Sequence, residues 1–204
     1  MRRYFVISIS CILFVIVVVY LVIDRKDLLS KQELLIEQNE EVRQINSLLY
    51  GNMKLHYIYA ERTLQDMILW DKSLNKVTLS DLVGDNEKLV FKFSPSNCST
   101  CIQSSFAALK KIANIISDNQ IIIIADKANR REIQALSNSM HLRYPIYLVD
   151  EKEFNDILRE ENIPFTFVID RDLIMKDLFI PMKELPEFSD MYYRIIWKKY
   201  FYEK

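Results

Sequence analysis

The chain has 204 residues, of which 27 are Lys or Arg and 28 are Asp or Glu, so its formal net charge is −1. Half of the residues are hydrophobic, which excludes a disordered chain, and the balanced charge offers no basic excess for nucleic acid. Three cysteines are too few for a small protein held together by disulfides. With only two glycines, neither a dinucleotide-binding loop nor a Walker-type phosphate loop can form.

The N-terminal segment is a long uncharged run. Residues 4–23 contain no charged side chain, and a helix rising 1.5 Å per residue over this length spans the roughly 30 Å hydrocarbon core of a bilayer. A cleaved signal peptide would have a shorter apolar core and a small-residue cleavage site, and a lipoprotein signal would have to use Cys11. We therefore predict an uncleaved transmembrane anchor over residues 1–23. Its short basic leader favours a signal-anchor with the rest of the chain outside the cytoplasm, although basic residues on the two sides are nearly balanced.

A helical stalk or linker is predicted over residues 24–76, because Leu, Glu, Gln, Lys and Arg are frequent there. One heptad column is apolar and consists of Leu28, Leu35, Val42 and Leu49. The companion column is mostly polar, so a strong coiled coil is not supported and only a weak dimer through the stalk stays open. Gly51 and Asn52 predict a break or kink in the helix.

The globular part is predicted over residues 77–204, where strand and helix patterns alternate. The predicted strands are 88–93, 120–125, 146–149, 165–170 and 173–179, and the predicted helices are 98–116, 129–139, 151–160 and 184–201. This alternation indicates an α/β fold with a central mixed sheet flanked by helices. The last two strands, joined by a short turn, add an antiparallel hairpin to the sheet.

One pair of residues has the chemistry of a reactive site: Cys98 and Cys101, separated by Ser99 and Thr100. The pair follows a predicted strand and opens a predicted helix. The first sulfur is thus expected at a helix N-terminus, where free N–H groups and the helix dipole stabilise a thiolate. The second sulfur lies about one turn further on and can close a small disulfide or resolve a mixed one. A Cys-x-x-Cys in this setting predicts a redox pair.

Two other uses of the cysteines stay open. A zinc site would need two more ligands, and outside the predicted anchor only His56 and His141 remain, so no metal site is expected. The two cysteines could also be merely buried, or form an inert structural disulfide.

A second motif, residues 162–172, reads NIPFTFVIDRD. In this motif and in the strand–Cys-x-x-Cys–helix order, the chain resembles the thioredoxin superfamily, most closely its membrane-anchored thiol-disulfide oxidoreductases of the TlpA/ResA type. The resemblance covers about residues 77–204 and implies a thioredoxin-like fold. It also implies that Cys98 is the exposed nucleophile, that Cys101 is the resolving thiol, and that Pro164 is a cis residue facing them. The backbone of Ile163 would then bind an extended substrate segment.

The sequence departs from this family at three places near the cysteines. Asn97 stands where tryptophan is common, which makes the expected rim of the site less apolar. Lys92, six residues before Cys98, stands where relatives often have a buried acid or amide, and Ser104 replaces an acidic residue found in some of them. Lys92 points either to solvent or beneath the cysteines, where its ammonium would tune their pKa by favouring a thiolate.

The sequence therefore predicts a membrane-tethered thiol-disulfide oxidoreductase with its C-terminal domain in the periplasm, acting without a cofactor. Its partners would be protein thiols and disulfides and a membrane thiol-electron donor, with no nucleic acid. Since no basic residue separates the cysteines, a reductase is favoured over an oxidase. The alternative is a redox-inactive thioredoxin-like adaptor tethered to the membrane. A peroxidase is disfavoured, because Pro95 lies only three residues before Cys98.

Overall fold

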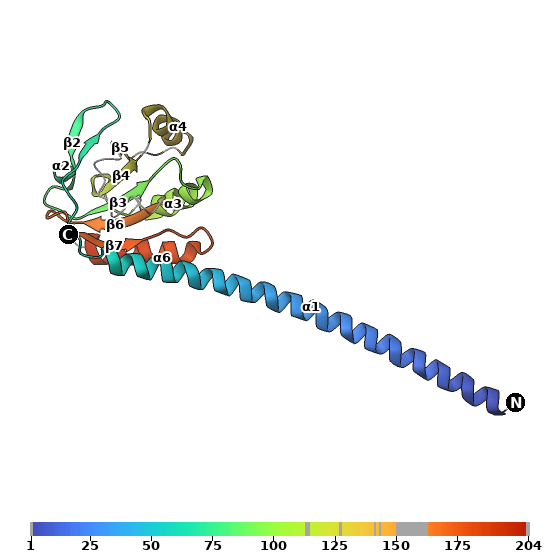
Figure 1. The fold of residues 1–204 in the computed structure, drawn as a ribbon. Helices are drawn as coiled ribbons and strands as arrows, with labels where there is room; N and C mark the ends of the chain where they lie inside the picture. Colours follow the sequence, from blue (N-terminus) through green and yellow to red (C-terminus); the bar gives the residue numbers. More distant parts are fainter. Residues whose placement is uncertain are drawn as a thin grey trace. The chain divides into compact units, whose positions relative to one another are not determined.

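A seven-stranded mixed sheet organises the C-terminal part of the chain (Figure 1). The structure, a computed structural model, describes residues 2–112, 115–126, 128–140, 142, 144–149 and 163–202, with side chains from residue 13 onward. The chain divides into two compact units, Met1–Ser47 and Leu48–Lys204. The predicted helix 151–160 and His141 lie outside the described residues.

The strand order in the sheet is β2-β1-β5-β4-β3-β6-β7. The three central strands β3, β4 and β5 are parallel, and the other neighbouring strands pair antiparallel. The strands are β1 (Ile68–Trp70), β2 (Lys76–Thr78), β3 (Lys88–Phe93), β4 (Ile121–Asp126), β5 (Ile146–Val149), β6 (Phe165–Ile169) and β7 (Met175–Phe179). Every residue of β3, β4 and β6 is buried, as expected for strands covered on both faces.

The helices of the structure are α1 (Arg2–Tyr59), α2 (Leu79–Val83), α3 (Ser99–Ile112), α4 (Arg130–Met140) and α6 (Pro186–Ile196). A 3₁₀ turn, η1 (Asp118–Gln120), precedes β4, and a π-helical turn, η2 (Trp197–Phe201), extends α6. Proline at the first position of α6 suits a helix start, because its fixed backbone angle matches the helix and its missing N–H would have no partner there.

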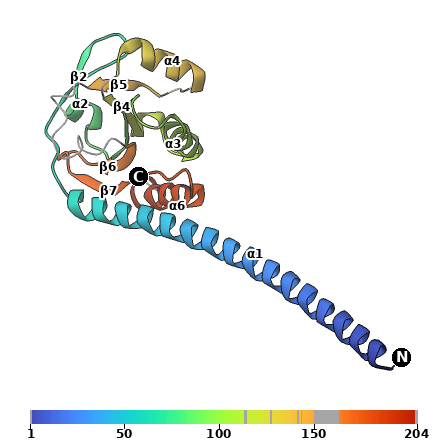
Figure 2. The ribbon, with the colours of Figure 1, turned by 45° about the vertical axis from the view of Figure 1, so that its right-hand side comes forward.

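Helices α3, α4 and α6 cover one face of the sheet (Figures 1 and 2). On this face, Phe91 of β3 lies 5.0 Å, centroid to centroid, from the ring of Phe106 in α3, in an edge-to-face arrangement. Ile133 of α4 and Ile196 of α6 belong to the same core. This core fixes α3, and therefore the start of α3, over the end of β3.

The opposite face of the sheet is covered by α2, the last turns of α1 and the segment that follows them. Leu55, Tyr59, Leu64, Met67 and Leu69 are all buried in this second core. The compact unit thus begins at Leu48, and residues 48–76, assigned to the stalk from the sequence, belong largely to the globular unit. These apolar residues pack against the sheet, and residues 68–70 and 76–78 of the same segment form its strands β1 and β2, so the segment cannot be a separate stalk.

Helix α1 runs without interruption through Gly51 and Asn52, where the sequence predicted a break. The side chain of Asn52 instead binds the backbone of Ile180, donating to its carbonyl at 3.2 Å and accepting from its N–H at 2.7 Å. Helix α1 ends at Tyr59, so residues 60–76 of the predicted helical stalk are not helical. The remaining predicted strands and helices that fall on described residues are confirmed. Their ends coincide with the predicted ones or differ by up to four residues, when η2 is counted with α6.

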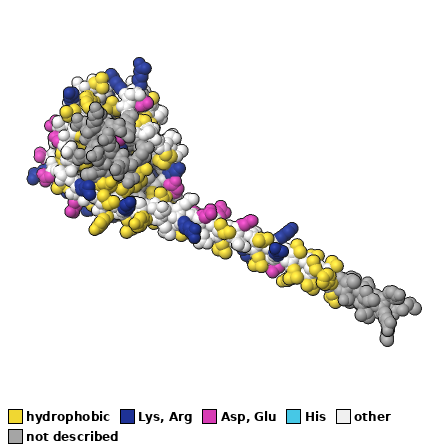
Figure 3. All heavy atoms as spheres, viewed as in Figure 1, with side chains coloured by type: hydrophobic (Ala, Val, Ile, Leu, Met, Phe, Trp, Pro, Cys, Tyr) yellow, Lys and Arg dark blue, Asp and Glu magenta, His cyan; other side chains and the backbone are white. Residues whose placement is uncertain are grey.

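All described residues of the unit Met1–Ser47 belong to α1. Every side chain from Leu13 to Ile23 is exposed, and Figure 3 shows hydrophobic side chains gathered there, followed by a stretch that carries Lys, Arg, Asp and Glu. Among the described residues, no helix combines the length and the apolar character needed to cross a membrane. The anchor expected over residues 1–23 is thus not found in the described part, and the side chains of residues 1–12 lie outside it.

Candidate active site

The two cysteines lie where β3 passes into α3. Phe93 ends the strand, and a tight turn from Ser94 to Asn97 leads directly to Cys98. The buried Asn97 holds this turn: its side-chain oxygen accepts from the N–H of Ser94 at 2.7 Å, and its own N–H donates to the carbonyl of Ser94 at 2.9 Å. The expectation that Asn97 lines the rim is therefore corrected, because this side chain closes the turn inside the fold.

Cys98 occupies the N-cap position of α3. Its carbonyl accepts the first helical hydrogen bond from Ile102 at 3.0 Å, and its sulfur accepts from the backbone N–H of Cys101 at 3.3 Å. The hydroxyl of Thr100 lies 3.0 Å from the same sulfur. A sulfur in this position satisfies one of the N–H groups that a helix leaves unpaired at its start, and it lies at the positive end of the helix dipole.

The surroundings shift the pKa values of the two thiols in opposite directions. Hydrogen bonds to the Cys98 sulfur, first from the Cys101 thiol and then from Thr100 and the Cys101 N–H, lower the pKa of Cys98 to about 7. Burial, followed by the interaction with Cys98, raises the pKa of Cys101. Cys98 is exposed, and Cys101 is partly buried. One sulfur is thus a solvent-facing group with thiolate character, and the other is a sheltered thiol.

Two charged residues of the segment between β7 and α6 also act on the cysteines. The positive charge of Lys183 lowers the pKa of both thiols, and the negative charge of Glu184 raises that of Cys101. The two side chains lie 3.6 Å apart and are exposed. Neither residue could be predicted from the sequence, because both stand more than 80 residues after the cysteines and no motif marks them.

Lys92 does not point to solvent, which corrects one of the two orientations expected for it. Its side chain is 2% exposed, and its ammonium lies 2.8 Å from a carboxylate oxygen of Asp126 and 5.4 Å from the ring centre of Phe165. Asp126 was not among the residues predicted near the cysteines. Because β3 and β4 are parallel, their carboxyl ends meet at one edge of the sheet, and an acidic residue at the end of β4 could have been considered from that pattern.

Ile163 and Pro164 precede β6, which pairs antiparallel with β3. Phe165 lies opposite Lys92 in the register, so residue 164 comes to the end of the sheet where β3 leads to Cys98. Pro164 is buried and Ile163 is partly buried. The described residues contain no cis peptide bond, so the predicted cis form of the Ile163–Pro164 bond is wrong for this structure. The trans form is the ordinary preference of a bond before proline, by about 0.5–1 kcal/mol.

Metal ligation finds no support in the described residues. No three His, Cys, Asp or Glu side chains come together there in a way that could hold a metal ion. The groups that act on the cysteines are each other's thiol, the Thr100 hydroxyl, the Cys101 N–H and the charges of Lys183 and Glu184.

Comparisons with solved structures agree with this architecture. A thiol:disulfide interchange protein from Bacteroides sp. superimposes with a TM-score of 0.56 at 17% identity, covering 71% of this chain and 92% of its own. A putative thiol:disulfide interchange protein DsbE from Chlorobium tepidum gives 0.52 at 17% identity, covering 68% and 96%. The peroxidoxin BcpB from Mycobacterium tuberculosis gives 0.50 at 16% identity, covering 68% and 97%. No protein-family model and no curated protein sequence matches the chain.

The protein thus has a thioredoxin-like α/β fold, with a mixed sheet, flanking helices and a long N-terminal helix. Its structural neighbours include thiol:disulfide interchange proteins, and the Cys-x-x-Cys pair stands at the start of a helix that directly follows a central strand.

Proposed function

We propose that this protein is a thiol-disulfide oxidoreductase that reduces disulfides of other proteins. The observation that carries the proposal is the inequivalence of its two sulfurs: Cys98 is exposed with a pKa of about 7, whereas Cys101 is partly buried with a raised pKa. An enzyme that exchanges disulfides needs one thiolate that meets the substrate and a second thiol that is held back until a mixed disulfide has formed.

The proposed reaction transfers two electrons to the client. The Cys98 thiolate attacks one sulfur of a client disulfide; a Cys98–client bond forms, and the other client sulfur leaves as a thiolate that takes a proton from water. Cys101, on losing its proton, then attacks the Cys98 sulfur and releases the second client thiol. The protein is left with a Cys98–Cys101 disulfide. A membrane thiol-electron donor, which we propose as the second partner, would reduce it again.

Several details support the reductive direction and the path of the client. A cysteine pKa of about 7 matches the value typical of reducing thioredoxins, whereas strongly oxidising relatives have values near 3.5. We further propose that Ile163 and Pro164, at the same end of the sheet as the start of α3, bind the client segment next to Cys98. We also propose that Lys92 lowers the pKa of the cysteine thiols. Its effect is smaller than that of Thr100, because Asp126 neutralises much of its charge.

The cellular setting is also a proposal. An anchor of the TlpA/ResA type over residues 1–23, with the C-terminal unit in the periplasm, is supported by the uncharged sequence of residues 4–23 and by the exposure of every apolar side chain from Leu13 to Ile23. A continuous apolar surface of this kind is unfavourable in water and marks a membrane or protein contact. A weak dimer would form through the exposed apolar residues of this helix, Leu28, Leu35 and Val42.

The test compares the wild type with the variants Cys98→Ser and Cys101→Ser. We expect the wild type to reduce insulin with dithiothreitol as the final electron source and Cys98→Ser to be inactive. Cys101→Ser should accumulate mixed disulfides with client proteins on non-reducing gels, because the internal resolving thiol is missing. The control is Ser105→Ala, which removes a buried hydroxyl bonded to the Cys101 carbonyl but no sulfur. Wild-type turnover no faster than that of Cys98→Ser would favour the redox-inactive adaptor instead.

A further inference from the structure

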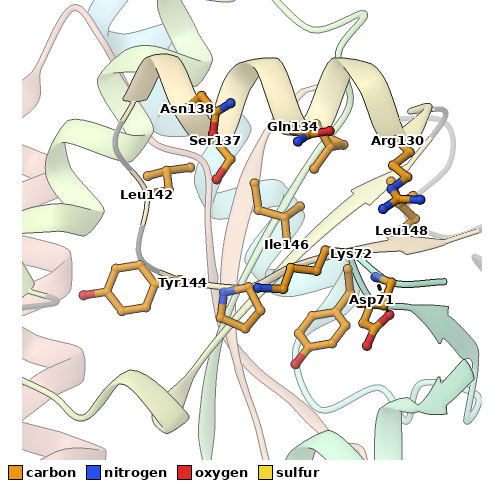
Figure 4. Close-up of a pocket in the computed structure, with 14 residues that line it drawn as sticks. Asp71, Lys72, Arg130, Gln134, Ser137, Asn138, Leu142, Tyr144, Ile146 and Leu148 are labelled. Atoms are coloured by element: carbon orange, nitrogen blue, oxygen red, sulfur yellow. Dashed lines mark hydrogen bonds between the residues drawn. The ribbon is translucent and has the colours of Figure 1, made fainter. Parts of the chain in front are cut away.

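A cavity of about 680 Å³ lies in the globular unit between α4, β5 and the turn that joins β1 to β2 (Figure 4). Its origin can be read from the register of the strands. β1 ends at Trp70, which pairs with Leu148, so Ile146 and Tyr147 of β5 have no partner residue on β1. The turn after Trp70 therefore stands away from β5, and α4 closes the space from above.

The helix α4 presents polar side chains to this cavity. Arg130, Gln134, Ser137 and Asn138 all line it, and Figure 4 shows them along the side of α4 that borders the space above β5. Arg130, Gln134 and Asn138 are spaced four residues apart, and Ser137 follows Gln134 by three, so the four side chains share one side of the helix. Like other helices over a sheet, α4 turns apolar residues toward the core, namely Ile133, Leu136 and Met140. Arg130, Gln134 and Asn138 lie beside this apolar face and are exposed. The polar face thus borders an open space rather than a packed core.

The charges around the cavity favour an anion. Lys72 reaches into it from the β1–β2 turn, and Arg130 stands at its opposite wall on α4. Within the described residues, neither cation forms an ion pair. The one carboxylate in the lining, Asp71, is already occupied: its oxygens accept from the N–H groups of Ser73 and Asn75 at 2.7 and 2.9 Å and from the Asn75 amide at 3.0 Å.

The remaining lining supplies hydrogen-bonding groups and an apolar floor. The amides of Gln134 and Asn138 and the hydroxyl of Ser137 can both donate and accept. Tyr147 adds a phenol whose pKa is raised by burial and by the charge of Asp71, so it stays a neutral donor. Ile146 and the other apolar side chains form the floor. Ligand sites of small molecules combine these features: a cavity of about 300–1,000 Å³, apolar walls and a few convergent polar groups.

We infer that this cavity is a second binding site, separate from the cysteines, for a small organic anion. The ligand would carry a carboxylate or phosphate group, attracted by the positive charges of Lys72 and Arg130, on a body with hydroxyl or amide groups, bound by the side chains of α4. Its volume suits a single small molecule rather than a folded partner. This inference does not depend on the redox activity, because none of the lining residues belongs to the cysteine pair or its electrostatic partners.

Isothermal titration of the purified full chain tests the inference with four probes. Glucose 6-phosphate carries a phosphate on a hydroxylated body, and gluconate carries a carboxylate on a similar body. Inorganic phosphate tests the anionic group without the body, and glucose tests the body without a charge. We expect glucose 6-phosphate or gluconate to bind at least about tenfold more tightly than glucose and inorganic phosphate, because both the charge and the body are recognised. Which of the two binds better identifies the anionic group.

Variants locate the binding. The double variant Lys72→Ala, Arg130→Ala should weaken the binding of the charged probes at least about tenfold. The control variant Arg171→Ala, Lys198→Ala removes two positive charges away from the cavity and should leave the binding unchanged. A Cys98→Ser chain should bind as the wild type does, whatever the outcome of the redox test. Absence of binding by both charged sugars at 10 mM, equal binding of glucose, or equal losses in both double variants would overturn the inference. Tighter binding of a triglutamate peptide than of every small probe would replace it with a peptide site.

Discussion

At the scale of single residues, the difference between two identical side chains comes from their place in one helix. Cys98 stands before the first turn of α3, where its sulfur meets an N–H group and the Thr100 hydroxyl, and these contacts favour the charged form. Cys101 stands one turn later, where burial favours the neutral form. Neither effect needs a basic residue between the cysteines.

This arrangement predicts how alkylation of Cys98 depends on pH. Since only the thiolate reacts, the rate with iodoacetamide should rise as the pH passes through about 7 and level off above it. Thr100→Ala removes one hydrogen bond to the thiolate and should slow alkylation at pH 7 by about threefold, with no change at pH 10. Ser99→Ala, which changes a neighbouring exposed hydroxyl with no bond to the sulfur, is the matched control. Equal rates for the wild type and Thr100→Ala at pH 7 would contradict the assigned cause.

A second prediction concerns the buried pair of Lys92 and Asp126. Asp126→Asn removes the carboxylate that lies 2.8 Å from the buried Lys92 ammonium, and loss of one partner of a buried pair costs about 3–5 kcal/mol of unfolding free energy. Lys92→Met combined with Asp126→Leu removes both charges and should be close to the wild type. Urea unfolding followed by tryptophan fluorescence measures both values.

The exposed pair of Lys111 and Asp190 is the control for this measurement. Its atoms are 2.6 Å apart, closer than those of the buried pair, but its side chains are 63% and 29% exposed. Lys111→Met should therefore change the unfolding free energy by less than about 1 kcal/mol. A loss for Asp126→Asn no larger than this would mean that water reaches the Lys92 site.

At the scale of elements, the side chain of Asn52 bonds the end of α1 to the backbone next to β7, in the way that a neighbouring strand would. Asn52 offers an acceptor to the N–H of Ile180 and a donor to its carbonyl, directly after β7 ends. The two bonds satisfy backbone groups that would otherwise lack a strand partner on that side. This contact explains why the helix continues through Gly51 and Asn52.

We expect Asn52→Ala to destabilise the globular unit by about 1–3 kcal/mol, because the N–H and carbonyl of Ile180 lose their partner. Asn39→Ala is the matched control in the same helix, since Asn39 is exposed and bonds only to the carbonyl of Leu35 within α1. Its effect should stay within about 0.5 kcal/mol. Thermal unfolding of the three chains gives the comparison, and equal midpoints for Asn52→Ala and the wild type would show that Ile180 is satisfied in another way.

At the scale of the whole molecule, the proposed tether predicts where the protein and its cysteines are found in the cell. The full chain should remain with carbonate-washed membranes, and a chain starting at residue 24 should appear in the soluble fraction, because the uncharged run of residues 4–23 is then missing. A membrane-impermeant maleimide should label Cys98 in cells whose outer membrane has been made permeable, and the variant Cys98→Ser, Cys101→Ser should not be labelled. Labelling only after complete lysis would place the globular unit in the cytoplasm.

Much of the architecture was predictable because it follows from local patterns. Short windows of sequence show the continuous apolar run of β4 and the alternation of strand and helix patterns around it. They also show that the cysteine pair stands between a strand and a helix. The start of the globular unit was predicted too late. Leu64, Met67 and Leu69 show no strong period of their own, and only their burial against the sheet assigns them to the unit.

The sequence by itself determined that the chain contains a strand–Cys-x-x-Cys–helix unit within an α/β layer fold, because secondary structure and the chemistry of a helix start depend on neighbours within a few residues. Only the tertiary structure decided which side chains surround that unit. It turned Lys92 inward onto Asp126, brought Lys183 and Glu184 to the cysteines from the far end of the chain, and left the cavity beneath α4 where β1 ends early. Each of these depends on contacts between residues distant in sequence, and such contacts are set by strand register and by the packing of the two cores rather than by any local pattern.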